Sequence, residues 1–141
     1  MKSQLQYPRK AYFIDNGFLT SLSTKFSKNY GRLFENFVFW HLTKKDKNLF
    51  YYKNDRGEEV DFVSIKNGKV GALYQACFDL QDFETYQREI KSLLKAGKKF
   101  SCQNLYVIGG KPTGKISEEE AKITFVDVAQ FLRGKYYQRT E

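Results

Sequence analysis

Two neighbouring predicted strands carry the residue types that could do chemistry in this chain. Asp61 lies in the run 59–63, Glu-Val-Asp-Phe-Val, and Gln75 and Cys77 lie at the end of the apolar run 70–77. A carboxylate on one strand and a Glu-x-Lys sequence on the next would bring two acids and an amine together around a divalent cation, which can hydrolyse phosphodiesters. Here Gln75 stands in place of the Glu and Cys77 in place of the Lys. The sequence therefore has the outline of a nuclease site with two chemical groups exchanged.

A third candidate, Glu35, lies on a predicted helix that is apolar on almost every side. A carboxylate in such surroundings needs a hydrogen-bond network, a cation or a proton. A Mg²⁺ ion held by Glu35 and Asp61 would meet this need, because Mg²⁺ takes oxygen ligands and keeps waters that a phosphate can displace. The alternative is structural: Glu35 caps its helix or pairs with Arg32 or Tyr51, and Asp61 pairs with a lysine. The apolar residues that share a helical stripe with Glu35 are Val38, Phe39 and Leu42.

The two exchanged residues weaken this site. If the hairpin register pairs the faces that carry Asp61 and Gln75, the two side chains become neighbours. Gln75 can then offer a metal ion a neutral carbonyl oxygen, which binds more weakly than a carboxylate. Cys77 offers neither a positive charge nor a strong hydrogen-bond donor. We therefore expect Glu35, Asp61 and Gln75 to bind Mg²⁺ or Mn²⁺ weakly, with little or no catalysis.

A sheet and a helix must bring these residues together, and the hydrophobic pattern predicts both. Helices are expected where apolar residues recur at helical spacing, and strands where β-branched and aromatic residues lie between turn residues. The expected helices are 30–45, 83–99 and a terminal turn at 128–132, and the expected strands are 11–14, 48–53, 59–66, 69–77, 104–108 and 122–126. Strands two to four form an antiparallel meander. The order helix, three-stranded meander, helix, strand predicts an α/β domain with a mixed sheet flanked by helices.

At 141 residues the chain has the length of one domain. We expect an N-terminal segment, 1–22, that leads into a core, 23–141. In that segment the predicted strand is followed by a turn at 15–17, Asp-Asn-Gly, and by a brief apolar turn or helix through Leu19 and Leu22.

Composition indicates which partners the chain could bind and in which cellular compartment we expect it. The chain carries 24 basic and 16 acidic residues, a formal net charge of +8, which favours a polyanionic partner such as nucleic acid. The alternative is that the surplus lysines only keep the surface soluble. No run is apolar and long enough to span a membrane, and the N-terminus lacks the apolar core of a signal peptide. The two cysteines show no metal-binding spacing and are expected to be free thiols in a reducing cytoplasm.

The run 109–116, Gly-Gly-Lys-Pro-Thr-Gly-Lys-Ile, has the spacing of a phosphate-binding P-loop. Ile116 stands where a Ser or Thr should hold Mg²⁺, and the Ser-Glu-Glu-Glu that follows would repel phosphate. We expect an exposed loop here and no intact ATPase motif in this chain.

Several ordered runs resemble one known family. The runs are 7–17 (Tyr-Pro-Arg-Lys-Ala-Tyr-Phe-Ile-Asp-Asn-Gly), 31–38 (Gly-Arg-Leu-Phe-Glu-Asn-Phe-Val), Tyr51-Tyr52, 57–63 (Gly-Glu-Glu-Val-Asp-Phe-Val) and 72–80 (Ala-Leu-Tyr-Gln-Ala-Cys-Phe-Asp-Leu). They look like the C-terminal domain of unknown function in a family of prokaryotic AAA-type ATPases. The resemblance covers essentially the whole chain.

The resemblance implies a restriction-endonuclease-like core of the PD-(D/E)xK type. In that pattern Glu35 corresponds to the helix Glu, Asp61 to the central acid, and Gln75 and Cys77 to the Glu-x-Lys pair. Arg88 and Lys91 on the following helix are candidates, by position alone, to replace the missing Lys.

Together these observations predict a nuclease-fold module of an AAA-type ATPase that is catalytically impaired and binds DNA or a partner. Its expected partners are nucleic acid and the ATPase portion of the same or a neighbouring protein. The alternatives are an active Mg²⁺-dependent deoxyribonuclease and a purely structural or oligomerisation domain.

Overall fold

The centre of the molecule is a five-stranded mixed sheet. The computed structural model describes residues 10–17, 30–110, 112 and 115–134. The strands lie side by side in their order along the chain. Their bounds are β1 Leu49–Lys53, β2 Glu59–Lys66, β3 Lys69–Ala76, β4 Leu105–Ile108 and β5 Ile123–Val126. The first three strands pair antiparallel and the last three pair parallel. The expected mixed sheet, with its antiparallel meander, is confirmed.

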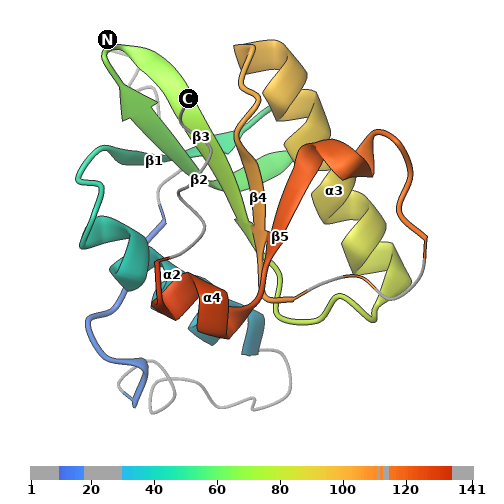
Figure 1. Cartoon of the computed structure of the whole chain (residues 1–141). Coiled ribbons are helices and arrows are strands. Elements are labelled where there is room, and N and C mark those ends of the chain that lie inside the picture. The colour runs from blue at the N-terminus through green and yellow to red at the C-terminus, as the bar shows by residue number, and fades with distance from the viewer. Residues whose placement is uncertain (1–9, 18–29, 111, 113–114, 135–141) are drawn as a thin grey trace, which may run out of the picture.

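Helices cover both faces of this sheet, as Figure 1 shows. Helix α2 (Tyr30–Thr43) and the short α4 (Val128–Leu132) lie on one face, and α3 (Phe83–Phe100) lies on the other. Each face has its own core. Leu93 of α3 is fully buried in one core, and Val38 and Leu42 of α2 are fully buried in the other. The predicted helices are confirmed, with ends that differ from the expected ones by two residues at most for the two long helices.

Local sequence explains the two boundaries that matter most for the site. The β2–β3 hairpin turns at Asn67 and Gly68, which have φ angles of 51° and 73°. Asn followed by Gly tolerates two positive φ angles and therefore fixes a two-residue hairpin. Helix α3 begins after Asp82, whose carboxylate accepts hydrogen bonds from the backbone N–H groups of Glu84 and Thr85. The hairpin turn sets where β2 ends and β3 begins, and the cap sets where α3 begins.

The N-terminal segment differs from the expectation. Residues 11–14 do not form a strand: residues 10–14 have no regular secondary structure and lie outside the sheet. They dock on α2 through Asn36, whose side chain accepts the Phe13 N–H at 2.8 Å and donates to the Phe13 carbonyl at 2.7 Å. A side chain thus supplies the partners that a neighbouring strand would have supplied. Leu19 and Leu22 lie outside the described residues.

A bulge in β2 lies at the acidic residue singled out by the sequence. In the β1–β2 pairing, Phe50 faces Val63 and Tyr52 faces Val60. One residue of β1 therefore lies opposite two residues of β2, Asp61 and Phe62. Such a bulge bends the strand and redirects a side chain. No helix among the described residues has the length and apolar composition that crossing a membrane requires.

Candidate functional site

The carboxylates of Asp61 and Glu35 converge on the ammonium group of Lys10. Lys10 Nζ lies 2.9 Å from Asp61 Oδ1, 2.9 Å from Glu35 Oε1 and 3.3 Å from Glu59 Oε1. The Tyr12 hydroxyl also donates to Glu35 Oε1, at 2.9 Å. The two acids that the sequence placed around a metal ion therefore surround an internal cation.

This arrangement matches one half of the structural alternative. Asp61 pairs with a lysine, as that alternative expected. The partners of Glu35 are Lys10 and Tyr12, where the sequence suggested Arg32 or Tyr51. Tyr51 contributes in another way, because Lys10 Nζ lies 4.7 Å from the centre of its ring, a distance at which a cation and an aromatic face attract.

Strands β2 and β3 separate beside Asp61, and side chains replace the backbone pairing there. The register ends at Phe62 opposite Tyr74. Beyond that pair, Asp61 Oδ2 accepts the Ala76 N–H at 3.0 Å, and Gln75 Oε1 accepts the Asp61 N–H at 3.3 Å. Asp61 and Gln75 are neighbours, as the register argument expected. Both are bound to the backbone of the opposite strand, which fixes them in place.

Burial is the largest single influence on the pKa values of the ionisable side chains in this cluster. The Asp61 side chain is 8% exposed. Burial raises the pKa of Asp61 above its ordinary value, as does the negative charge of Glu35, while Lys10 and the Ala76 N–H oppose the shift. Burial alone would lower the pKa of Lys10, but Asp61 and Glu35 outweigh it and hold the Lys10 pKa above its ordinary value. Burial and Glu35 also raise the pKa of Tyr12. Lys10 is therefore a cation and Tyr12 a neutral donor at neutral pH.

Gln75 faces helix α3. Its side chain is almost fully buried, and its Nε2 donates to Glu89. Glu89 in turn lies 2.9 Å from the guanidinium of Arg88. Arg88, one of the two suggested replacements for the missing lysine, lines the cleft beside these residues, with a side chain that is 71% exposed. Lys91, the other, is not among the residues that line it.

Cys77 is a neutral, buried thiol. Burial raises its pKa to about 12, and the negative charges of Glu89 and Asp61 add to the shift. Its backbone is held by the end of β4, since the Cys77 N–H donates to the Ile108 carbonyl at 2.9 Å. Gly109 has a φ of 140°, and a Cβ there would lie 1.9 Å from the Cys77 carbonyl oxygen, so only glycine fits. Cys77 cannot supply the positive charge of the lysine that it replaces.

A cleft of about 810 Å³ opens between the first turns of α2 and α3, and Glu35, Asp61, Gln75 and Cys77 are among the residues that line it. The rings of Tyr30 and Phe78 stack at its lining, with centroids 5.6 Å apart, and both side chains are more than half exposed. The charged residues among those that line it are mostly acidic: Glu35, Glu59, Asp61, Asp79, Asp82 and Glu89 against Arg32 and Arg88. The cleft therefore attracts cations and repels phosphate groups.

The contribution of Lys10 was missed because the sequence gives no direct indication of it. Lys10 is separated from Asp61 by 51 positions in the chain. Asn36 holds its segment in place, bonding Phe13 twice and donating to Asn16 Oδ1 at 2.8 Å. One indication was present: Glu35 and Asn36 are adjacent polar residues in the middle of a mostly apolar helix, and both need partners from another segment.

The residues as arranged do not fit a divalent ion. In the ranges that the structure describes, no group of three or more His, Cys, Asp or Glu side chains could hold a metal ion. Glu35 and Asp61 do face one point, but the Lys10 ammonium lies there. Gln75, the third suggested ligand, uses its carbonyl oxygen on the Asp61 N–H.

Part of this chain is similar in sequence to known proteins. Residues 30–75 match the family model described as a domain of unknown function, DUF4143. An uncharacterized protein of Methanocaldococcus jannaschii is 40% identical over 100 residues. That match covers 68% of this chain and 21% of the archaeal protein, so the chain spans about a fifth of that relative's length. No solved structure matches the chain. From Tyr30 to Gln75 the chain is thus similar to a domain of unknown function. The matching region of this chain contains Glu35 and Asp61.

Proposed function

We propose that this domain is a nucleic-acid-binding module with a nuclease-type acidic site that its own Lys10 keeps closed. The observation that carries the proposal is the position of the Lys10 ammonium, within 3.3 Å of three carboxylates. A cation is the group that such a cluster needs, and the N-terminal segment supplies it internally. Mg²⁺ or Mn²⁺ would have to displace a partly buried, hydrogen-bonded ammonium before it could bind.

Two further features support a binding role over catalysis. The amine that would orient an attacking water is replaced by Cys77, whose pKa of about 12 keeps it neutral. The net charge of +8 suits a polyanionic partner. The acidic cleft repels phosphate, so binding must use another surface of the domain.

We also propose that the module works beside an AAA-type ATPase. The support is the sequence resemblance described above. It is compatible with the archaeal relative, of which the matching region is about a fifth. The ATPase would then bring the nucleic-acid-binding module to its target or move the module along the nucleic acid.

One observation favours a second function, an active metal-dependent deoxyribonuclease. Lys10 Nζ lies 2.9 Å from Asp61, so Lys10 could provide the amine that position 77 lacks. The same contact therefore has two opposite interpretations. In one, Lys10 blocks the site, and in the other it takes part in the reaction.

Substitution of Lys10 distinguishes these interpretations. The full chain and its Lys10→Ala variant are incubated with labelled single- and double-stranded DNA in Mg²⁺ or Mn²⁺, with Lys53→Ala as the control. Lys53 is suitable because it pairs with Glu59 at 3.5 Å but is far more exposed. We expect the wild type to bind without cutting, with an affinity that falls steeply as salt increases.

Cleavage by the wild type that is lost in both Lys10→Ala and Asp61→Asn would show that the domain is an active nuclease. Absence of binding at low salt would refute the nucleic-acid role and leave interaction with a protein. Binding of Mn²⁺ to Lys10→Ala but not to the wild type, measured by calorimetry, would support a closed site.

A further inference from the structure

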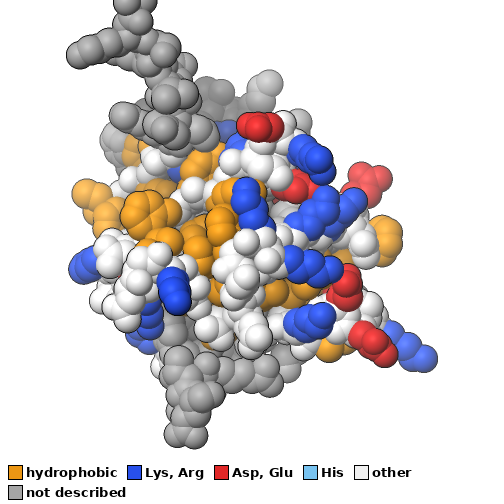
Figure 2. Space-filling model, turned by 90° about the horizontal axis from the view of Figure 1, so that it is seen from above, with side chains coloured by type: hydrophobic (Ala, Val, Ile, Leu, Met, Phe, Trp, Pro, Cys, Tyr) orange, Lys and Arg blue, Asp and Glu red, His pale blue; other side chains and the backbone are white. Residues whose placement is uncertain are grey.

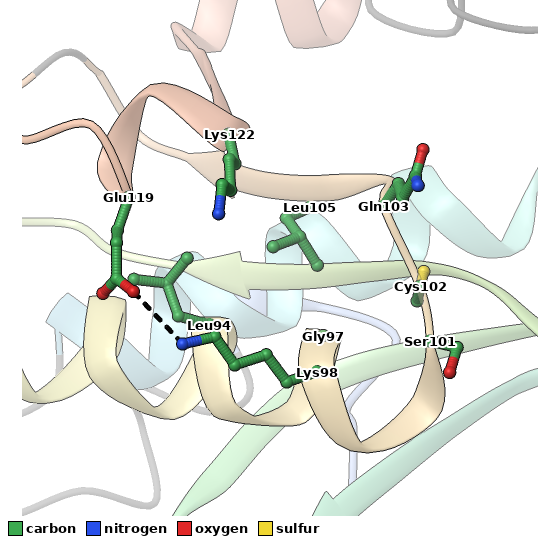
Figure 3. Close-up of a pocket in the computed structure, with 9 residues that line it drawn as sticks. All are labelled: Leu94, Gly97, Lys98, Ser101, Cys102, Gln103, Leu105, Glu119 and Lys122. Carbon is green, nitrogen blue, oxygen red and sulfur yellow. Dashed lines mark hydrogen bonds and ion pairs between the residues drawn. The ribbon is translucent and has the colours of Figure 1, made fainter.

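A groove of about 540 Å³ lies at the opposite end of α3 from the acidic cleft. Figure 3 shows it between the last turns of α3, the beginning of β4 and the 3₁₀ helix η2 (Glu120–Lys122). Leu94 and Leu105 form its apolar floor. Its volume lies within the range of small-molecule sites and exceeds what a phosphate group alone would need.

The charged groups of this groove come from two separate elements. Lys98 belongs to α3 and Lys122 to η2, and in Figure 3 the Lys122 side chain points into the groove. Glu119 is the one carboxylate among the lining residues and lies 3.1 Å from Lys98 Nζ. Both members of this pair are exposed, by 70% and 60%, so water screens their attraction and another anion can replace Glu119. Lys98, Lys122 and the hydroxyl of Ser101 are donors that suit a phosphate.

The basic surface continues beyond the groove along α3. Lys95 pairs with Glu58, and Lys99 Nζ lies 4.9 Å from the centre of the Tyr52 ring. Figure 2 shows Lys and Arg side chains interspersed with acidic side chains on the half of this face that lies over α3. Positive charge at the end of a helix is also favoured by the helix dipole. The acidic and basic surfaces of the domain are therefore at opposite ends of one helix.

We propose that this groove binds a single strand of nucleic acid, with a phosphate between Lys98 and Lys122 and a base on Leu94 and Leu105. The proposal rests on the nucleic-acid role proposed above and assigns it to a surface. A base must be unpaired to reach an apolar floor, which selects a single strand over a duplex. Neither of the two lysines and neither leucine reads a base edge, so any sequence preference should depend on the amide of Gln103, which also lines the groove.

The test compares two double variants that remove the same charge. Lys98→Ala with Lys122→Ala alters the groove, and Lys44→Ala with Lys47→Ala alters exposed lysines after α2. Binding of a fluorescein-labelled oligothymidylate is measured by anisotropy over a range of KCl concentrations. The groove variant should reduce the slope of log K against log salt by about 0.7, since the two lysines neutralise one phosphate and each phosphate on a single strand contributes ~0.7. If the affinities converge near ~1 M salt, that slope means about 5-fold weaker binding at ~0.1 M.

The control variant should keep the wild-type slope, and equal losses in the two variants would overturn the assignment to the groove. Such a result would leave the general nucleic-acid role intact, whereas absence of binding by the wild type would refute that role. Tighter binding of a duplex of the same length would contradict the proposal that an unpaired base lies on Leu94 and Leu105. Displacement of the oligonucleotide by polyglutamate of equal charge and at equal concentration would show that the groove takes acidic chains in general, and would also overturn the proposal. Circular dichroism of both variants checks that they are folded.

Discussion

Removal of the Lys10 ammonium should destabilise the domain in a pH-dependent way. The change is Lys10→Met, which keeps most of the length and the apolar stem of the side chain while deleting the charge. It leaves Asp61 and Glu35 facing each other without their shared cation. The expected cost follows from the distances and burial of these groups.

Two contacts at 2.9 Å each correspond to roughly 6 kcal/mol at an effective dielectric constant of ~20. The cost of taking the ammonium out of water, several kcal/mol, offsets much of this sum. Removal of one partner of a buried pair typically costs about 3–5 kcal/mol. Lys10 and Glu35 retain about a fifth of their side-chain exposure, so we expect a loss of about 3 kcal/mol at neutral pH.

The sign of the pH dependence follows from Asp61. Its native pKa is raised above the ordinary value of 3.8 by burial and then by Glu35, so the native state holds the proton more tightly than the unfolded state. Stability therefore falls as pH rises from that ordinary value through the native one. Without Lys10 the native pKa of Asp61 rises further, and the falling range extends to higher pH. Lys10 stays charged throughout, because its native pKa is raised and its stabilisation is lost only above its unfolded value of 10.5.

The assay is urea unfolding of wild type and Lys10→Met between pH ~5 and ~8, where the difference in unfolding free energy should grow with pH. Lys53→Met is the matched control. Its ion pair with the same Glu59 is longer and more exposed, so its loss should stay below about 1 kcal/mol. The double variant Lys10→Met with Asp61→Asn should recover part of this stability, since it removes the unpaired charge at the buried position 61 but leaves Glu35 without its cation. Equal losses in Lys10→Met and Lys53→Met, or a loss that does not change with pH, would refute the reasoning.

Two other predictions concern the segment that carries Lys10 and the thiols. Asn36→Ala removes both hydrogen bonds to Phe13 and should cost about 2–3 kcal/mol, with faster tryptic cleavage after Lys10; an unchanged cleavage rate would contradict the docking role of Asn36. Cys77 and Cys102 are buried, and burial raises the pKa of Cys77 to about 12, so iodoacetamide at pH ~8 should modify neither in the native protein and both in urea. Modification of native Cys77 at the unfolded rate would contradict its environment.

Most of the secondary structure could be predicted because its determinants are local. The Asn67-Gly68 turn fixes the β2–β3 hairpin by backbone conformation alone, and the predicted bounds of β2 agree with the structure. Helix α3 was recognisable from its apolar spacing and begins at a local cap, Asp82. These two features depend on residues a few positions apart. That Asp61 lies beside Gln75 depends in addition on a shift of register between Ile65–Val70 and Ser64–Ala72, which the turn by itself does not determine.

The segment around Lys10 could not be predicted in the same way. Its apolar pattern resembles a strand, but the strand partner is missing and the side chain of Asn36 binds its backbone instead. The bulge opposite Tyr51 depends on pairing between two strands, so it does not appear in the pattern of either strand alone.

The sequence by itself determined the order of elements and the presence of two acids that need a cation. Only the tertiary structure decided which cation meets that need. Lys10 lies 25 positions from Glu35 and 51 from Asp61, and packing against α2 brings them to 2.9 Å. The physical reason is that burial creates the need for a countercharge, while the fold selects the group that meets it. The tertiary structure likewise separated the acidic cleft from the basic groove, at the two ends of α3.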